Sequence, residues 1–398
     1  MILVSKLHSQ NWQQLPNFPS GGRDDGSVFV IGNNVYCGLG AAVSTGISSD
    51  FYRFNPLNDT WATYTVASLP AIGKQYCMAF SYANYGYIIG GVDANWQTSN
   101  MVWRYDTMTN NWIQKTSIPD SVQGAVCFFI NNKAYIAGGR DKNNICTSKV
   151  WEYDIINDTW QQKNNMPNNG RWRASGAVIN NKGYLILGAD SLNRFSKDLF
   201  EYNPVNDAWV LIDSFPNKGR NYASAFNINN KLVVALGIDT ANIVYNDCYS
   251  FDISTHQWQN QTPLPSFGRK GCMAFSFNNS AYITAGIDGM SNRLVETWKG
   301  DNITGIETLS SIFQDIIIYP NPNEGVLTVN YSISDPTGKD ATLRLIEMGT
   351  GRVLISKTVS CNTTQSVIDL NEFANGVYSL SIQSNANAPI TIRVVKVR

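Results

Sequence analysis

Apolar and polar positions alternate in a pattern that repeats about every 49 residues through the first three-quarters of the chain. Six glycines mark the repeat: Gly40, Gly91, Gly139, Gly188, Gly237 and Gly286. A tryptophan stands 21 residues after each of the first five, namely Trp61, Trp112, Trp160, Trp209 and Trp258. This constant spacing predicts a repeat architecture.

Each repeat reads as four short strands. Between the glycine and the tryptophan, residues alternate as aromatic, any, aromatic and acidic, as in Trp103–Asp106 and Trp151–Asp154, which is typical of a strand with one buried face. Before the glycine lies a hairpin signal, as in Ile130–Tyr135, where Asn131 and Asn132 can supply the positive φ that a tight turn needs.

Repeats of about 50 residues with these features resemble kelch repeats, and the resemblance covers residues 11–301. The fold it implies is a β-propeller. Only two repeats keep a full glycine pair, Gly90-Gly91 and Gly138-Gly139, whereas Leu39, Leu187, Leu236 and Ala285 replace the first glycine elsewhere. We therefore expect that only the second position needs the conformational freedom of glycine.

The ends of the repeat region predict how the ring closes. The last repeat has Gly286 but Glu307 where its tryptophan should stand, so its outer strand is missing. Trp12 lies 28 residues before Gly40, the interval that also separates Trp258 from Gly286. We therefore predict an all-β fold, a six-bladed propeller closed by the N-terminal strand, with no open sheet edge.

The period stops after Asp301, and a second, smaller β-domain follows. We expect a linker at 302–314 and a small β-sandwich at 315–398, with strands at 315–319, 342–346, 367–370, 376–380 and 390–395. Tyr319, Pro320, Asn321, Pro322 and Gly325 form the turn after its first strand.

The order of motifs in this domain resembles the type A sorting domain of type IX secretion substrates. The motifs are Tyr319-Pro320-Asn321-Pro322 with Gly325, then Gly351, then Ile368-Asp369-Leu370, then Asn375-Gly376-Val377-Tyr378, and finally Lys396-Val397-Arg398. The resemblance implies passage across the outer membrane of a Bacteroidetes-type, Gram-negative bacterium and removal of the domain by a sortase-like peptidase. The protein would then be extracellular or held at the outer-membrane surface. An accessory sugar-binding sandwich is the alternative.

Composition narrows the possible partners. Lys plus Arg and Asp plus Glu both number 30, so the chain has no net charge that would attract nucleic acid. No apolar run is long enough to span a bilayer. Residues 1–10 are too weakly apolar for a signal peptide, and we expect them to be a leader remnant or disordered, with the mature chain beginning near Asn11. The seven cysteines form no CxxC pair and are expected to be free.

Candidate chemistry is sparse. The two histidines, His8 and His256, have no partner at ligand spacing, so we predict no metal, no cofactor and no catalytic residue. Asp24 and Asp25 are adjacent at a strand start, where neighbouring side chains point to opposite faces, and we expect them to be solvated turn residues.

One set of residues remains as a candidate ligand site. Counting 17 residues back from each marker glycine gives a cation in five of six repeats: Arg23, Lys74, Arg171, Arg220 and Arg269, with Val122 as the exception. Tyr76, Trp172 and Tyr222 lie beside them. We expect this set to ring one mouth of the channel, where it could bind a carboxylate or an acidic sugar. Because a repeated residue in a repeat protein is more often structural, the structural interpretation is favoured, with each arginine bridging to carbonyls or to an acidic residue.

Two functions follow from this site. The first is a surface-displayed binding module whose ligand is an extracellular glycan or protein, and the short, uniform loops favour it. The second is a sugar-processing enzyme, because six-bladed kelch proteins include the sialic acid mutarotases. An enzyme needs a titratable carboxylate or histidine near the cations, whereas a binding site needs only donors and aromatic rings.

Overall fold

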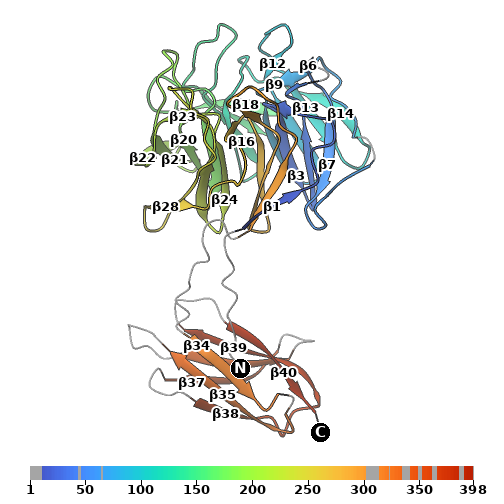
Figure 1. Ribbon diagram of the computed structural model, residues 1–398, viewed down its shortest axis with the longest axis vertical. Helices are drawn as coiled ribbons and strands as arrows, with labels where there is room; N and C mark the ends of the chain where they lie inside the picture. Colours follow the sequence, from blue (N-terminus) through green and yellow to red (C-terminus); the bar gives the residue numbers. More distant parts are fainter. Residues whose placement is uncertain are drawn as a thin grey trace. The chain divides into compact units, whose positions relative to one another are not determined.

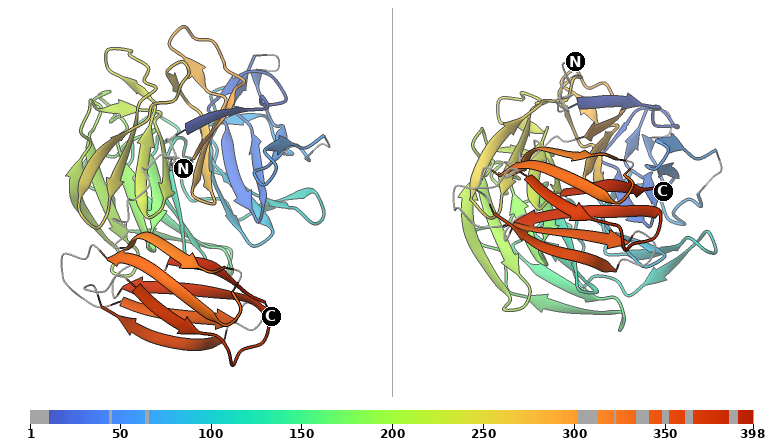
Figure 2. Two further views of the ribbon diagram at one scale, coloured as in Figure 1. Left: turned by 60° about the horizontal axis from the view of Figure 1, so that its bottom comes forward. Right: turned by 90° about the horizontal axis from the view of Figure 1, so that it is seen from below.

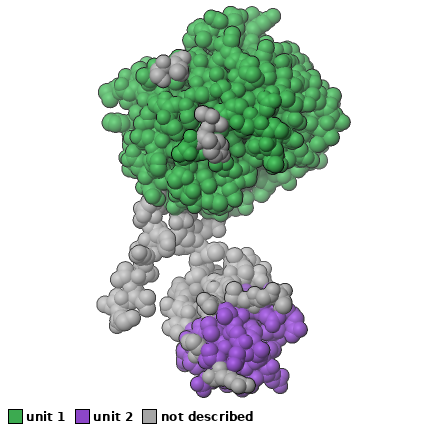
Figure 3. Space-filling model, turned by 90° about the vertical axis from the view of Figure 1, so that its right-hand side faces the viewer, with its two compact units in different colours: residues 1–305 green, residues 306–398 purple. Residues whose placement is uncertain are grey.

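The structure is a computed structural model that describes residues 11–43, 46–63, 66–301, 313–321, 323–333, 341–347, 352–360, 365–384 and 390–397. These residues contain strands and turns and no helix, so the described part has no helix that could cross a membrane. The chain divides into two compact units, residues 1–305 and 306–398, which are coloured separately in Figure 3. Residues 1–10 and 302–312, the expected leader remnant and most of the expected linker, lie outside the described ranges.

The first unit is a ring of six four-stranded antiparallel sheets, as Figures 1 and 2 show. We number the blades 1 to 6 in the order of their marker glycines. Blade 1 contains β3 (Ser27–Ile31), β4 (Asn34–Gly38), β7 (Phe51–Asn55) and β8 (Thr60–Trp61); blade 2 contains β10 (Met78–Tyr82), β11 (Tyr85–Ile89), β13 (Val102–Asp106) and β14 (Asn111–Lys115); blade 3 contains β15 (Val126–Ile130), β16 (Lys133–Ala137), β17 (Val150–Asp154) and β18 (Thr159–Lys163). Blade 4 contains β19 (Ser175–Ile179), β20 (Lys182–Ile186), β21 (Asp198–Asn203) and β22 (Ala208–Ser214); blade 5 contains β24 (Ser224–Ile228), β25 (Lys231–Ala235), β27 (Cys248–Asp252) and β28 (Gln257–Gln261).

Blade 6 joins the two ends of the propeller and confirms the predicted closure. Its strands are β30 (Met273–Phe277), β31 (Ser280–Thr284), β33 (Thr297–Asp301) and β1 (Asn11–Leu15). Trp12 pairs with Gly300, and its indole N–H donates to the Thr262 carbonyl of blade 5 at 3.0 Å. The repeat tryptophan Trp112 makes the same bond to the preceding blade, through the Ala67 carbonyl at 2.8 Å.

Short two-residue strands extend the inner hairpins at one end of the ring, the upper end in Figure 1. They are β2 (Arg23–Asp24), β5 (Ala41–Ala42) and β6 (Gly46–Ile47) in blade 1, β9 (Lys74–Gln75) and β12 (Val92–Asp93) in blade 2, β23 (Arg220–Asn221) and β26 (Ile238–Asp239) in blade 5, and β29 (Arg269–Lys270) and β32 (Ile287–Asp288) in blade 6. In blades 3 and 4 isolated bridges take their place, Gln123 to Arg140 and Trp172 to Ala189. These ribbons and bridges contain or directly adjoin the residues of the candidate ligand site.

The hairpin turns have the predicted backbone. Asn131 and Asn132 have φ of 50° and 64°, and the other Asn-Asn turns are similar. The two left-handed residues give a turn whose twist matches that of the flanking strands.

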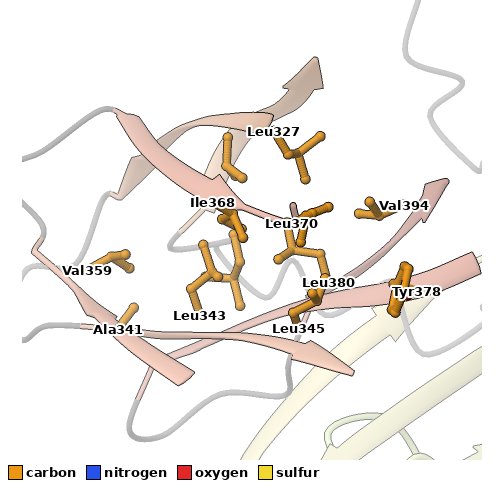
Figure 4. Packing of buried hydrophobic residues seen from close by; sticks show 12 residues of the cluster. Leu327, Ala341, Leu343, Leu345, Val359, Ile368, Leu370, Tyr378, Leu380 and Val394 are labelled. Atoms are coloured by element: carbon orange, nitrogen blue, oxygen red, sulfur yellow. The ribbon is translucent and has the colours of Figure 1, made fainter. Parts of the chain in front are cut away.

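The second unit is a two-layer sandwich. One sheet contains β34 (Phe313–Tyr319), β35 (Val326–Ile333) and β38 (Gln365–Asp369); the other contains β37 (Val353–Val359), β36 (Ala341–Glu347), β39 (Gly376–Ser384) and β40 (Ile390–Lys396). Strand β34 begins two residues before the boundary expected at 315. Leu327 and Ile368 from one sheet pack with Leu343 and Leu380 from the other in a single apolar core (Figure 4).

Candidate functional site

All five predicted cations are buried, and the four arginines among them point into their own blades. Arg23, Arg220 and Arg269 are fully buried and Arg171 is 4% exposed. Each guanidinium donates to the carbonyl of the residue just before the marker glycine and to a carboxylate 27 residues further along the chain. The pairs are Arg23 with Leu39 and Asp50, Arg171 with Leu187 and Asp198, Arg220 with Leu236 and Asp247, and Arg269 with Ala285 and Glu296. These contacts support the structural alternative, and a ligand-binding role for these arginines stays a prediction.

The carbonyl acceptor in these blades belongs to a residue with strained backbone. Leu39, Leu187, Leu236 and Ala285 have φ between 59° and 66°, the left-handed region that L-residues rarely adopt. The expectation that only the second glycine position has a backbone requirement is therefore wrong, since both positions are left-handed. Where leucine or alanine stands at the first position, a buried arginine holds its carbonyl in place.

Blades 2 and 3 depart from this arrangement in all three residues. They have Gly90 and Gly138 at the strained position, Lys74 and Val122 in place of arginine, and Met101 and Lys149 in place of the acid. The Lys74 side chain is buried, and no ion pair with a described residue holds its ammonium. The arginine, the strained non-glycine residue and the acid thus occur together or not at all.

The channel mouth is formed by residues two positions after the predicted cations. Each has φ between 51° and 63°, and each backbone N–H donates to the carbonyl of the equivalent residue in the preceding blade, at 2.7–3.4 Å. The six residues are Asp25, Tyr76, Gly124, Arg173, Tyr222 and Gly271, with Asp25 donating to Gly271 to close the ring. The same periodic count, started 15 rather than 17 residues before each marker glycine, would have found them.

Arg173 is the centre of this mouth. Its guanidinium carbon lies 3.3 Å from the ring centroid of Tyr222, 3.7 Å from that of Tyr76 and 4.1 Å from that of Trp172. Its Nη1 atom lies 3.5 Å from Oδ1 of Asp25, and both side chains are at most 7% exposed. The structure therefore brings the three predicted aromatic residues together, but around a cation that the sequence analysis missed.

Asp24 and Asp25 are buried, so the expectation that they are solvated turn residues is wrong. Asp24 accepts a hydrogen bond from Nε of Arg293 at 2.6 Å. Burial raises the pKa of Asp25 to about 7, against the opposing charge of Arg173 and with a further contribution from the neighbouring Asp24 carboxylate. Asp25 can therefore gain or lose a proton near neutral pH.

Two further cations at the mouth lie on aromatic rings. The guanidinium carbon of Arg140 is 3.5 Å from the ring centroid of Trp172, and Nζ of Lys270 is 5.2 Å from that of Tyr222. The two rings contact each other edge to face, with centroids 6.1 Å apart. Neither cation forms an ion pair with any carboxylate of the described chain, so both charges are available to a ligand.

Below the mouth, the channel wall is made of small side chains. A cavity of about 240 Å³ is lined by residues such as Gly26, Cys77, Ala125 and Ala174, each directly after a residue of the ring. Burial raises the pKa of the Cys77 thiol to about 12, so it stays protonated. The described residues contain no group of three His, Cys, Asp or Glu side chains that could hold a metal ion.

The predicted sorting residues lie mostly at one end of the sandwich. The Asn321 side chain accepts from the Val395 N–H at 2.8 Å, and the buried Lys396, which pairs with Gly376, donates from Nζ to the carbonyls of Asn371 and Phe373. Gly325 has φ of 138° and no room for a Cβ beside Asn371. Tyr378 is buried and donates to the Ala374 carbonyl, whereas Tyr319 and Pro320 are exposed. Pro322, Gly351 and Arg398 lie outside the described residues.

Comparisons with known proteins agree with this architecture. Residues 35–295 match the family described as Attractin/LZTR1 beta-propeller, and residues 317–397 match the secretion system C-terminal sorting domain. A solved structure titled "Structure of YjhT" is similar, with a TM-score of 0.63 and 19% identity over 71% of this chain and 96% of that chain. A search of curated proteins found no match.

At this level of identity, the likeness to the solved propeller shows the fold alone. The family match spans most of the ring, from β4 into the segment before β33, and the sorting-domain match spans nearly all of the sandwich and indicates export to the cell surface or exterior. The chain belongs to the Attractin/LZTR1 β-propeller family and carries a secretion-system sorting domain.

Proposed function

We propose that the exported propeller is a binding module for a carboxylate-bearing sugar, which it holds at the channel mouth. The observation that carries the proposal is the pair Arg140 and Lys270, two cations with no carboxylate partner among the described residues, lying on Trp172 and Tyr222. A carboxylate accepts charge-assisted hydrogen bonds from such groups, and a sugar ring packs against the aromatic faces.

The buried Arg173 has a different role in this proposal. Its side chain is 5% exposed and is held between Tyr76, Tyr222 and Asp25. It fixes the orientation of both tyrosine rings, so the mouth is organised before a ligand arrives. Preorganisation of this kind lowers the entropic cost of binding.

The test is a titration of the full chain with N-acetylneuraminic acid, glucuronic acid and galacturonic acid, using glucose and galactose as uncharged comparators. We expect the acids to bind and the double variant R140M/K270M to weaken binding at least about tenfold. R194M is the matched control, because Arg194 is an exposed arginine whose charge is already paired with Asp190. Acid binding that R140M/K270M leaves unchanged, or that R194M weakens equally, would contradict the proposal.

A second candidate, an enzyme that interconverts sugar anomers, is favoured by one observation. Asp25 lies at the mouth with a pKa raised to about 7 by burial, which is the range a general acid or base needs. Opening of a cyclic sugar takes a proton from the anomeric hydroxyl and returns one to the ring oxygen. Asp25 could carry that proton if a ligand enters the mouth.

Anomer exchange followed by NMR separates the two candidates. In the enzyme, acceleration would rise with pH through about 7 as Asp25 ionises, and D25N would abolish it while the sugar still bound. In a binding module, no acidic sugar would exchange faster in the presence of the protein. Loss of binding in D25N would assign Asp25 to organising the mouth instead.

A further inference from the structure

Blade 3 contains a cavity of about 270 Å³ at the place where four other blades hold their buried arginine. We propose that this cavity binds one pyranose ring of a neutral sugar. The site is separate from the channel mouth and goes beyond the acidic-sugar function proposed there. Its lining includes Val122, Gly138, Asp120, Lys149 and Trp151.

The cavity arises from side-chain identity and not from a change of backbone. The Val122 N–H donates to the Ser99 carbonyl at 3.1 Å, just as the Arg269 N–H donates to the Tyr245 carbonyl at 3.1 Å. Gly138 has φ of 73°, close to the 65° of Leu187. The frame that holds an arginine in blades 1, 4, 5 and 6 is therefore intact in blade 3, while the guanidinium is absent.

The inner end of the cavity offers a hydrogen-bond acceptor. The Gly138 carbonyl corresponds to the Leu187 carbonyl, which accepts from Nη1 of Arg171 at 3.3 Å. Within the described chain, no side chain donates to the Gly138 carbonyl. A ligand hydroxyl that reached this end would meet an unfilled acceptor, which favours a ligand rich in O–H donors.

Trp151 supplies an aromatic wall. The residue at this position of the repeat faces the guanidinium in other blades, with ring centroids 5.1 Å from Arg171 for Phe200 and 5.6 Å from Arg23 for Tyr52. In blade 3 the equivalent ring borders the cavity instead. The indole N–H donates to Oδ2 of Asp120 at 3.2 Å, which fixes the orientation of the ring. An exposed face of a fixed indole packs well against the C–H face of a sugar.

The charges at the outer rim are balanced, which favours a neutral ligand. Nζ of Lys149 lies 2.8 Å from Oδ2 of Asp120, and both side chains are about half exposed. The Asp141 carboxylate already accepts the backbone N–H groups of Asn143 and Ile145. The lining holds two acids, Asp120 and Asp141, and two lysines, Lys142 and Lys149, so the rim offers donors and acceptors to hydroxyl groups with no net charge.

The size of the cavity limits the ligand to a single ring. Pockets for drug-sized ligands measure roughly 300–1,000 Å³, and this cavity lies just below that range. One monosaccharide, or the terminal unit of a glycan, is the largest ligand of this class that fits. The affinity expected of one such ring is in the millimolar range.

The test fills the cavity by restoring the arrangement of the other blades. The double variant V122R/K149D introduces the arginine and the acid of blades 1, 4, 5 and 6 into blade 3. The matched control K74R/M101D makes the same change in blade 2. Glucose, galactose, mannose and fucose are titrated separately into the full-length proteins and followed by saturation-transfer NMR.

We expect at least one of these sugars to bind the natural chain and the V122R/K149D variant to lose at least about tenfold in affinity, with the blade 2 variant unchanged. Absence of binding by all four sugars, or equal loss in both variants, would overturn the proposal. Acidic-sugar binding at the mouth should survive V122R/K149D, so failure of one site is distinguishable from failure of the other.

Should V122R/K149D fail to melt cooperatively, W151F provides a second test. Phenylalanine keeps an aromatic ring in the wall but loses the N–H that bonds to Asp120 and part of the stacking surface. We expect a weakening of neutral-sugar binding by about threefold or more. Unchanged affinity in W151F would overturn the proposal.

Discussion

The propeller builds the same blade in two ways. Blades 1, 4, 5 and 6 place a buried arginine and its acid behind a strained residue, whereas blades 2 and 3 place glycine at that residue and have neither. The six blades share the same order of four antiparallel strands. The arginine therefore recurs because it stabilises a local backbone, and blade 3, which lacks it, has a cavity in its place.

The largest expected effect comes from removing a guanidinium from an arginine blade. R220M leaves the Asp247 carboxylate and the Leu236 carbonyl without their donor, and we expect it to lower the free energy of unfolding by about 3–5 kcal/mol. The matched change in blade 2, K74M, removes an ammonium that holds no acid and should cost less than about 1 kcal/mol. Urea unfolding measures the loss of stability in each variant. Equal losses in R220M and K74M would mean that the arginine does not stabilise its blade more than the lysine does.

A smaller effect is expected from exchanging the residue before the marker glycine. G90A puts a Cβ at φ of 63° and 2.3 Å from the Val122 carbonyl oxygen, so we expect a loss of about 2 kcal/mol. A285G removes one buried methyl group but relieves the strain at φ of 62°, and the two effects should cancel to within about 1 kcal/mol. Thermal unfolding of both variants tests this, and a larger loss in A285G would contradict it.

The smallest effect concerns acid stability. Burial opposes ionisation of Asp50, but hydrogen bonds from Arg23 and Ser48 hold its pKa below the usual range, and the pKa of Glu296 is lowered in the same way by Arg269 and Ser266. A carboxylate with a lowered folded-state pKa stabilises the protein above its unfolded pKa, and this stability is lost as pH falls through the folded pKa.

We therefore expect the propeller to lose stability below about pH 4 and D50N to reduce that loss by about 1–2 kcal/mol. D120N, in the exposed pair of blade 3, is the control and should change the acid dependence little. Unfolding free energies measured from pH 3 to pH 7 distinguish the two variants. An acid dependence that D50N leaves unchanged would contradict the assignment.

The sequence predicted those features that depend on local periodicity. The turn at Asn131 and Asn132 and the closing strand at Trp12 could be predicted, because the same local signal recurs from repeat to repeat. The type and order of the motifs after Asp301 likewise predicted the sandwich and its sorting signal.

The candidate site could not be placed in the same way, because the side-chain direction changes within two residues. Arg171 points into its own blade, whereas Arg173, in the left-handed conformation, points to the channel axis. Its contacts come from blades 1, 2 and 5, through Asp25, Tyr76 and Tyr222. The six equivalent positions hold one Asp, two Tyr, two Gly and one Arg, so no single residue type marks them. The repeat count locates these positions, but it does not show that the Arg173 side chain turns towards Asp25, Tyr76 and Tyr222.

The pairing of β1 with β33 has a consequence for the timing of folding. The first strand of the propeller finds its partner only when residues up to Asp301 are available, so blade 6 cannot be completed before the rest of the ring has been synthesised. Until then β1 and β33 both present unpaired backbone, and a chain cut short within blade 6 would keep these sites open to proteases and to other chains. Only a propeller that includes both β1 and β33 can therefore close its sixth sheet and cover these edges.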